Sequence, residues 1–435
     1  MRHLAESGDS PWSQPGFAPF WTAFSVSSFG NYVTTLAIQV LVVLTLHEGA
    51  GGVGLVQAAL WFPYLLFGVM AGVLVDRSQR RPLLIATDLS RGVLLVAIPL
   101  LATTHDLTLT TLVIFMAMFG LLSLVNDAAA QAFLPRLVPR HLLVAANARL
   151  DQSDAVAQTS GPAVAGALVS LLSAPWAVLV DAASYLASGF LLLRVPVVEP
   201  ARRRASLHTV RMEAVEGLRW VYTHATLRPL ALSTHSWFLC VALAGAVETP
   251  FALRSLSLNA FGLGLVLAVG GIGGLAGSLA AARLGARFGT GRVVVACSAL
   301  TGVAWGVIAL SPHGPAGWVL FAAGQLLFGL SIGAENANSL GYRQLVTADH
   351  LQGRTNATMR SINRAMIVVG APIGGLLGDV VGFRPILWAS AVGFLLGAAA
   401  LGLSGFRHVR IEGGASSDSP FPPPKHSAEL WFGAH

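Results

Sequence analysis

Long apolar segments run through almost the whole chain, and they constrain its fold more than any other feature. Apolar residues make up 54% of the 435 residues and charged residues only 11%, whereas soluble domains carry about 25% charged residues. A helix of about 20 residues crosses the roughly 30 Å hydrocarbon core of a bilayer. We therefore predict an all-α integral membrane protein with twelve transmembrane helices. We place them at 17–46, 53–75, 83–103, 108–134, 144–173, 175–194, 228–253, 260–282, 292–311, 315–342, 356–381 and 384–405.

Basic residues set the predicted orientation of these helices. Short loops rich in Lys and Arg stay on the cytoplasmic side of a membrane. If the chain begins in the cytoplasm, only Arg254 and Arg384 of the 27 basic residues fall on the outer side. We therefore predict a multi-pass protein of the inner (cytoplasmic) membrane with both termini in the cytoplasm.

Several functional classes leave sequence signatures that this chain lacks. The net charge of +7 comes from arginines scattered over short loops, so it does not indicate nucleic-acid binding. The sequence contains no Gly-x-x-x-x-Gly-Lys-Ser/Thr loop and no His-Glu-x-x-His pair. Cys240 and Cys297 fall inside apolar segments, where thiols pack as small apolar groups. We predict no catalytic residues, no cofactor and no metal.

An internal repeat relates the two halves of the chain by a shift of 209 residues. The shift superposes several glycines and one polar pair: Gly120 on Gly329, Gly161 on Gly370, Gly166 on Gly375, and Asn126-Asp127 on Glu335-Asn336. Repeats of this kind are typical of transporters built from two related bundles. The repeat therefore predicts two pseudo-symmetric six-helix bundles.

The predicted domain boundaries follow from this repeat. We expect a cytoplasmic segment at 1–16, an N-terminal bundle at 17–194, a linker at 195–227, a C-terminal bundle at 228–406 and a disordered cytoplasmic tail at 407–435. The linker stretch from Val210 to Tyr222 is amphipathic, which favours a helix on the membrane surface. A linker without such a helix is the alternative.

One charged loop carries a family resemblance. The segment Gly72-Val-Leu-Val-Asp76-Arg77-Ser-Gln-Arg80-Arg81 separates two apolar runs, and its charges place it at a membrane surface. It resembles the loop between the second and third helices of major facilitator transporters, except that Gln79 stands where the family usually has Gly. The resemblance extends from about Phe17 to Phe406 and implies two bundles that rock about a central binding site.

A second group of segments narrows the resemblance. Leu134-Pro-Arg-Leu-Val-Pro139, followed by Ala146-Asn-Ala148 and Ser160-Gly-Pro162, is similar to the siderophore and macrolide efflux branch of bacterial drug exporters. Proline removes a backbone donor and bends a helix. We therefore expect a kink at Gly161 and Pro162, repeated at Gly370 and Pro372.

Acidic residues inside the predicted helices are the candidates for proton coupling or gating. An ionised group near the bilayer centre costs at least about 2.5 to 3.5 kcal/mol, so it needs a partner, a water-filled cavity or a proton. We expect Asp127 and Glu335 on facing halves near the inner mouth of a cavity, and Glu248 near an outer gate. We predict that at least one of them titrates during transport. Hydrogen bonding that only holds the helices together is the alternative.

Four amides are predicted to supply polar groups to the cavity: Asn31, Asn126, Asn336 and Asn338. Related exporters often have Gly-Asp where this chain has Gly30-Asn31. Because an amide does not release a proton, Asn31 can bind a substrate but cannot carry the coupling charge.

By resemblance, Asp76 latches the two halves together on the cytoplasmic side. Arg360 and Arg364 open the eleventh predicted helix, and an anion at a helix start is favoured by about 0.3 to 1 kcal/mol. Asp88 and Arg91 share one face of the third helix and are expected to join the latch. A solvated loop is the alternative. The full predicted latch consists of Asp76, Arg77, Arg80, Arg81, Asp88, Arg91, Arg360 and Arg364.

Together these features predict a secondary transporter. We expect export of a hydrophobic small molecule, such as a drug or secondary metabolite, by alternating access coupled to protons. A cavity with aromatic and apolar walls favours a lipophilic substrate that is neutral or weakly cationic. Expected partners are this substrate, protons and membrane lipids, and we expect a monomer. The alternatives are uptake of a metabolite and a receptor or scaffold that keeps the fold without transport.

Overall fold

Helices account for nearly all of the regular structure. The computed structural model describes residues 10–196 and 207–410, with the side chains of a few helical residues, including Asp76, left outside the description. Within these residues, twelve helices are long and apolar enough to cross a membrane. The predicted fold class and number of spans are confirmed.

The helices fall into two sets of six joined by one further helix. The first set is α1 (Phe17–Val40), α2 (Ala50–Arg77), α3 (Arg80–Thr103), α4 (Leu109–Leu137), α5 (Leu143–Leu172) and α6 (Ala174–Leu192). The second set is α8 (Leu227–Pro250), α9 (Ala260–Phe288), α10 (Thr290–Leu310), α11 (Pro315–Val346), α12 (Asp349–Val381) and α13 (Phe383–Leu403). Between them lies α7 (Leu207–Thr223). Five short turns complete the order: η1 (Pro11–Ser13), η2 (Leu41–Thr45), η3 (Arg140–Leu142), η4 (Phe251–Ser255) and η5 (Gly405–His408).

Local sequence explains where several helices begin and end. The Thr108 hydroxyl accepts a hydrogen bond from the Thr111 amide (3.2 Å), and Asn259 Oδ1 accepts one from the Gly262 amide (2.7 Å), so both side chains cap a helix start. Gly289 follows α9 with a φ of 89°, a conformation that favours glycine.

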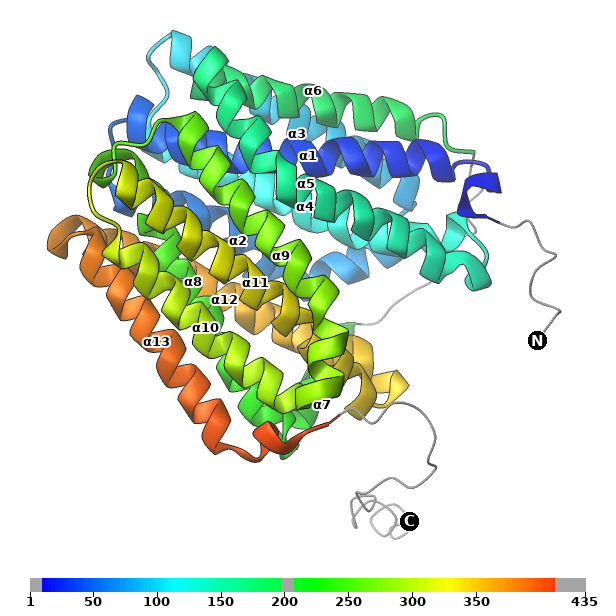
Figure 1. Ribbon diagram of the computed structural model, residues 1–435. Coiled ribbons are helices and arrows are strands. Elements are labelled where there is room, and N and C mark those ends of the chain that lie inside the picture. Colours follow the sequence, from blue (N-terminus) through cyan, green and yellow to red (C-terminus); the bar gives the residue numbers. More distant parts are fainter. Residues whose placement is uncertain (1–9, 197–206, 411–435) are drawn as a thin grey trace, which may run out of the picture.

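The two sets of helices repeat the same neighbours. In the first set α1 packs on α5 and α6, α2 on α4, and α3 on α4 and α6. In the second set α8 packs on α12 and α13, α9 on α11, and α10 on α11 and α13. The π-helical turns η2 and η4 extend α1 and α8 at matching places. The structure therefore contains two pseudo-symmetric bundles, shown side by side in Figure 1.

The two bundles meet at one end and separate toward the other (Figure 1). We call the end that carries η2 and η4 the distal end, and the end that carries η1 and η5 the proximal end. Near the distal end, a Cβ atom on Gly375 would lie 2.2 Å from the Ala50 carbonyl oxygen. On the other side of the interface, a Cβ on Gly264 would lie 2.3 Å from the Pro162 carbonyl oxygen. Toward the proximal end, a Cβ on Gly72 would meet nothing within 4 Å.

Helix α7 rests on the C-terminal bundle. Glu216 forms an ion pair with Arg354 of α12, and a Cβ on Gly217 would lie 2.8 Å from the Arg354 carbonyl oxygen. The amphipathic stretch expected from Val210 to Tyr222 lies within this helix. Residues 1–9, 197–206 and 411–435 lie outside the described residues, and so do most of the predicted N-terminal segment, part of the predicted linker and nearly all of the predicted tail.

Candidate functional site

A cavity with two lobes lies between and within the bundles. The N lobe, about 450 Å³, is lined by helices of the first set, and the C lobe, about 560 Å³, is lined mainly by α9 and α11 of the second set. Tyr32, Thr35 and Gln39 of α1 line both lobes. The lobes therefore adjoin each other along α1, in the position expected of a central binding site.

The N lobe combines aromatic walls with carboxyl groups. Asp127 of α4 lines it and accepts a hydrogen bond from the Tyr64 hydroxyl of α2 (2.7 Å). Trp61 and Phe119 also line it, and the Trp61 and Tyr64 rings lie 5.1 Å apart. The lobe can therefore hold an apolar molecule beside an acid.

Asp154 of α5 is a second acid of the N lobe, and the sequence analysis missed it. It follows Asp151-Gln-Ser in the sequence, inside the span predicted at 144–173. Several polar residues lie close together in this run, so the sequence does not single out the one on the face of α5 that turns toward the cavity.

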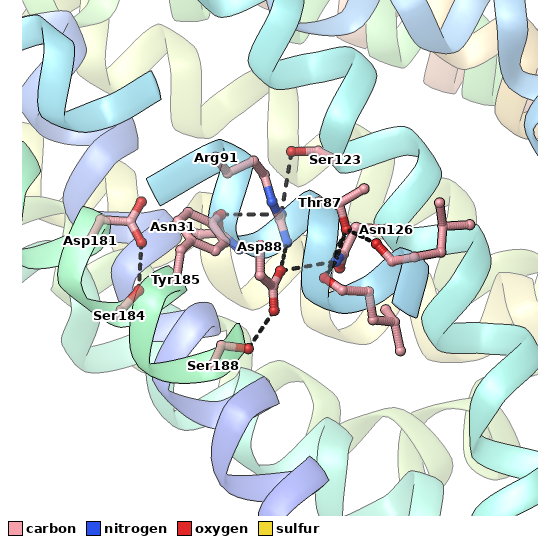
Figure 2. Close-up of polar contacts among 12 residues, drawn as sticks. Asn31, Thr87, Asp88, Arg91, Ser123, Asn126, Asp181, Ser184, Tyr185 and Ser188 are labelled. Atoms are coloured by element: carbon pink, nitrogen blue, oxygen red, sulfur yellow. Dashed lines mark hydrogen bonds and ion pairs between the residues drawn. The ribbon is translucent and has the colours of Figure 1, made fainter. Parts of the chain in front are cut away.

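A buried ion pair within the N-terminal bundle lies next to the N lobe (Figure 2). Arg91 is only 5% exposed and pairs with Asp88. Asp88 also accepts hydrogen bonds from Asn126 Nδ2 (2.9 Å) and from the Ser188 hydroxyl (2.5 Å). The Arg91 guanidinium lies 4.1 Å from the centroid of the Tyr185 ring.

The same network reaches the cavity through two residues. Arg91 lines the N lobe, and the Tyr185 hydroxyl donates a hydrogen bond to Asn31 Oδ1, on a residue that also lines the lobe. The expected pairing of Asp88 with Arg91 is present, but its expected place in a surface latch is wrong. Asp88 lies eight residues into α3, about 12 Å along the helix, and therefore inside the bundle.

Glu248 is the acid of the C lobe. It lines this lobe and accepts a hydrogen bond from Gln325 Nε2 of α11. The next residue, Thr249, donates to Gln39 Oε1 of the other bundle (2.5 Å). Glu248 thus lies beside a contact that joins the bundles, in the half of the cavity nearer the distal end.

Asp127 and Glu335, expected on facing halves near the inner mouth of a cavity, do lie on different bundles, but the structure does not bring them to the same cavity. Asp127 and Asn336 line the two lobes, whereas Glu335 lines neither of them. Instead, Glu335 Oε1 accepts a hydrogen bond from the Ser298 hydroxyl of α10 (3.2 Å), and its other oxygen is buried without a hydrogen-bond partner among the described residues. Asn126 likewise turns back toward α3. Adjacent helical residues point about 100° apart. The repeat therefore gives Asp127 and Asn336 the same direction, toward the cavity, although only Asp127 is an acid. It turns Asn126 and Glu335 away from the cavity.

The remaining predicted residues pack helices together. Asn338 lies outside both lobes, and its amide donates to the carbonyl oxygens of Ala281 (3.1 Å) and Ala334 (2.9 Å). A Cβ on Gly161 would lie 2.7 Å from Tyr32 Cβ, and one on Gly370 would lie 2.9 Å from the Leu239 carbonyl oxygen. Pro162 and Pro372 lie inside α5 and α12, and both helices continue past them.

The predicted latch is only partly described. The side chain of Asp76 lies outside the described residues. Arg77 ends α2 and Arg80 begins α3, while Arg81 donates to the carbonyl oxygens of Leu192 (3.0 Å) and Leu193 at the end of α6.

The placement of Arg360 and Arg364 at a helix start is wrong. Helix α12 begins at Asp349, which puts these arginines 11 and 15 residues into it. The Arg364 guanidinium carbon lies 3.7 Å from the centroid of the Trp61 ring of α2. Arg364 therefore lies in the interface between the bundles.

Enzymatic signatures find no structural support in the part of the chain that is described. Gly329-Leu-Ser331-Ile-Gly333 has the spacing of a hydrolase elbow, but it lies inside α11, where the Ser331 hydroxyl bonds to Thr301 and to the Phe328 carbonyl oxygen. Among residues 10–196 and 207–410, no cluster of three His, Cys, Asp or Glu side chains could hold a metal ion.

Comparison with known proteins gives matches over most of the chain. Residues 6–431 match the family described as transmembrane secretion effector. The chain is 27% identical to the multidrug efflux pump Tap of Mycolicibacterium fortuitum, over 88% of this chain and 94% of the pump. It is 26% identical to the multidrug efflux pump Tap of Mycobacterium tuberculosis, over 91% of this chain and 95% of the pump.

Solved structures share the fold at low identity. The nucleoside transporter NupG superposes with a TM-score of 0.69 at 12% identity, over 88% of this chain and 97% of NupG. A bacterial homologue of the iron transporter ferroportin superposes with a TM-score of 0.68 in its inward-facing state, at 16% identity over 88% of this chain and 97% of that one. In its outward-facing state the TM-score is 0.57. The arrangement of the two bundles is thus more similar to the inward-facing form.

Proposed function

Because the chain belongs to the transmembrane secretion effector family of the major facilitator superfamily, we propose that it exports a lipophilic small molecule from the cytoplasm by alternating access, driven by the proton gradient. Its family and the structural neighbours are transporters, which confirms the prediction of a transporter rather than an enzyme. The proximal end faces the cytoplasm in this proposal.

One observation carries the proposal: acids and aromatic rings line a cavity between bundles that meet at the distal end and separate toward the proximal end (Figure 1). Asp127 and Asp154 supply acids to the N lobe, and Glu248 supplies one to the C lobe. An acid that is hydrated in one state and enclosed in another changes its affinity for protons, which couples proton movement to rocking. The efflux pumps at 26 to 27% identity support export over uptake.

Inverted membrane vesicles containing the protein provide the test. We expect a lipophilic dye to accumulate in them when a proton gradient is imposed, and an uncoupler to abolish the accumulation. Vesicles without the protein are the control. Accumulation only in right-side-out vesicles would favour uptake instead. Binding of the dye with no flux in either orientation would favour a receptor or scaffold.

A further inference from the structure

Arg364 lies at a close contact between α2 and α12, part of the way from the distal to the proximal end. The two helices pack antiparallel, with Ala50 against Gly375 near the distal end and Trp61 against Arg364 further along. About two turns beyond Trp61, a Cβ on Gly68 would meet nothing within 4 Å. Arg364 therefore sits at the vertex where the bundles part.

Only aromatic rings hold this cation. The Arg364 guanidinium carbon lies 3.7 Å from the Trp61 ring centroid and 5.7 Å from that of Tyr64. Its Nε is buried without a hydrogen-bond partner, and no carboxylate of the described residues forms an ion pair with it. A guanidinium on an aromatic face is attracted by the ring quadrupole.

The rings that hold Arg364 belong to the wall of the N lobe. Trp61, Tyr64 and Asp127 all line this lobe, and the Tyr64 hydroxyl donates to Asp127 (2.7 Å). Aromatic faces beside a carboxylate are the chemistry that recognises organic cations. The N-terminal bundle thus supplies the aromatic wall, and the C-terminal bundle supplies a cation, Arg364, that packs against it.

We propose that Arg364 is an internal competitor of cationic substrates for this wall, and that it drives their release. The inference rests on the proposed function, because it requires a substrate in the N lobe and bundles that rock. In the described state the proximal end is open, and Tyr64 contacts both Arg364 and Asp127. When the proximal end closes, α12 approaches α2, and Arg360, one turn before Arg364, reaches the same wall. The guanidinium groups of Arg360 and Arg364 then neutralise the charge of Asp127 in place of the substrate cation, which leaves toward the distal end.

Other charged groups near Asp127 do not replace this role. Arg91 of α3 is committed to Asp88 within the same bundle, so its distance from Asp127 does not depend on how the bundles are placed. Arg364 belongs to the opposite bundle. A charge on α12 therefore makes the affinity of the N lobe for cations depend on the state of the transporter.

The test compares a cation with an uncharged analogue on the full-length protein in lipid nanodiscs. Tetraphenylphosphonium is the cation and triphenylphosphine oxide the uncharged analogue. We expect Arg364→Gln to bind tetraphenylphosphonium about tenfold more tightly, because it removes the repulsion of a unit positive charge on the same wall, where the effective dielectric constant is about 20. Affinity for triphenylphosphine oxide is expected to stay unchanged. Arg364→Lys keeps the charge and is expected to behave like the unchanged protein toward both compounds.

Arg287→Gln is the matched control. Arg287 also lies over an aromatic ring, 5.3 Å from the centroid of Phe288, and it lines neither lobe. It is expected to alter neither affinity. If Arg364→Gln proves unstable, Arg364→Met, which keeps the aliphatic stem, gives the same comparison.

A transport measurement separates this inference from the proposed function. In inverted vesicles, Arg364→Gln is expected to move tetraphenylphosphonium at least severalfold more slowly while it moves an uncharged dye at the normal rate. If the unchanged protein transports both compounds and Arg364→Gln affects them equally, or affects neither, the competitor role is refuted and export stands. If the unchanged protein neither binds nor moves any of these compounds, the proposed function fails and this inference fails with it.

Discussion

At the scale of single residues, Asp127 is the group on which transport should depend most. The Asp127→Asn variant keeps an oxygen for the Tyr64 hydroxyl, 2.7 Å away, but it can no longer exchange a proton. We expect it to reduce proton-driven accumulation in inverted vesicles at least tenfold. Tyr64→Phe removes a hydrogen bond to a charged group, worth about 1.5 to 3 kcal/mol, and should retain slower transport.

The control for this comparison is Asp106→Asn, at an exposed carboxylate in the turn between α3 and α4. It should transport normally. Full proton-driven transport by Asp127→Asn would exclude Asp127 from proton coupling.

The Asp88–Arg91 pair is expected to matter for stability before it matters for transport. Arg91→Met leaves Asp88 buried with only neutral partners, Asn126 and Ser188. Removing one member of a buried ion pair costs about 3 to 5 kcal/mol. Asp88→Asn combined with Arg91→Met removes both charges and should recover part of the loss. Thermal unfolding of the unchanged protein and of these two variants measures this, and a double variant no more stable than Arg91→Met would contradict the pairing.

Residue types in the sequence predicted which side chains are chemically important better than where they point. Asn126 and Asp127 are neighbours, so no pattern of hydropathy decides which of the two faces the cavity. Spacing correctly paired Asp88 with Arg91, but their depth depends on where α3 begins. Asp154 was missed because it lies among other polar residues within the span predicted at 144–173, and the sequence does not show which of them faces the cavity.

At the scale of helices, the sequence predicted the membrane-spanning part of each helix but not its full length. Hydropathy placed the eleventh span at 356–381, whereas α12 begins at Asp349. Its first turns, Asp349-His-Leu-Gln-Gly-Arg, are polar and helical, and hydropathy does not detect helix outside hydrocarbon. This difference moved Arg360 and Arg364 from a helix start to the bundle interface.

Replacing a glycine of α12 by alanine should destabilise the protein only where α12 packs closely against α2. A Cβ on Gly375 would lie 2.2 Å from the Ala50 carbonyl oxygen, whereas a Cβ on Gly353 of the same helix would meet nothing within 4 Å. Overpacking costs about 1 to 3 kcal/mol. We expect Gly375→Ala to lower the melting temperature and to expose the distal end to a membrane-impermeant maleimide at an introduced Gln39→Cys. Gly353→Ala should do neither, and equal effects of both would contradict the close crossing.

The start of α8 should be sensitive to pH. His224 Nδ1 accepts hydrogen bonds from the Thr226 and Leu227 amides (both 3.3 Å), and only an unprotonated Nδ1 can do so. Burial lowers the pKa of His224 below its usual value of 6.5. The cap therefore contributes fully above about pH 6.5 and is lost as the pH falls through the lower, folded-state pKa.

The measurement is thermal unfolding at about pH 7.5 and about pH 5, chosen to lie on either side of the ordinary histidine pKa. His224→Asn supplies a cap that does not titrate. The unchanged protein should lose about 1 kcal/mol more stability in acid than the variant does, the size of a typical cap. If both proteins lose the same stability in acid, the acid sensitivity arises from a group other than His224.

At the scale of the whole molecule, the repeat and the scarcity of charge were enough to predict two six-helix bundles in a membrane. They were not enough to predict how the two bundles are tilted relative to each other. The V-shaped opening follows from where small residues let α2 approach α12 and α5 approach α9. Those contacts exist only in three dimensions, and the same glycines would fit more than one tilt.

The opening itself can be tested with two cysteine pairs on α2 and α12. Cys240 and Cys297 are buried and are first replaced by serine. Gly51→Cys with Leu376→Cys joins the distal end, where a Cβ on Gly51 would lie 3.8 Å from Leu376 Cα, within the range that disulfides accept. Gly72→Cys with Gly353→Cys joins the proximal end, where both positions face empty space.

We expect mild oxidation to form the distal disulfide in the resting protein and the proximal one only during turnover, when the bundles close there. Either bond fixes the bundles in one state, so each should stop transport, and a reducing agent should restore it. The antiparallel packing that places Trp61 against Arg364 continues, if extended, to Gly72 opposite Gly353, which is why closure should bring this pair together. Rapid proximal cross-linking in the resting protein, or full transport by either oxidised variant, would contradict a transporter that rocks about the vertex at Arg364.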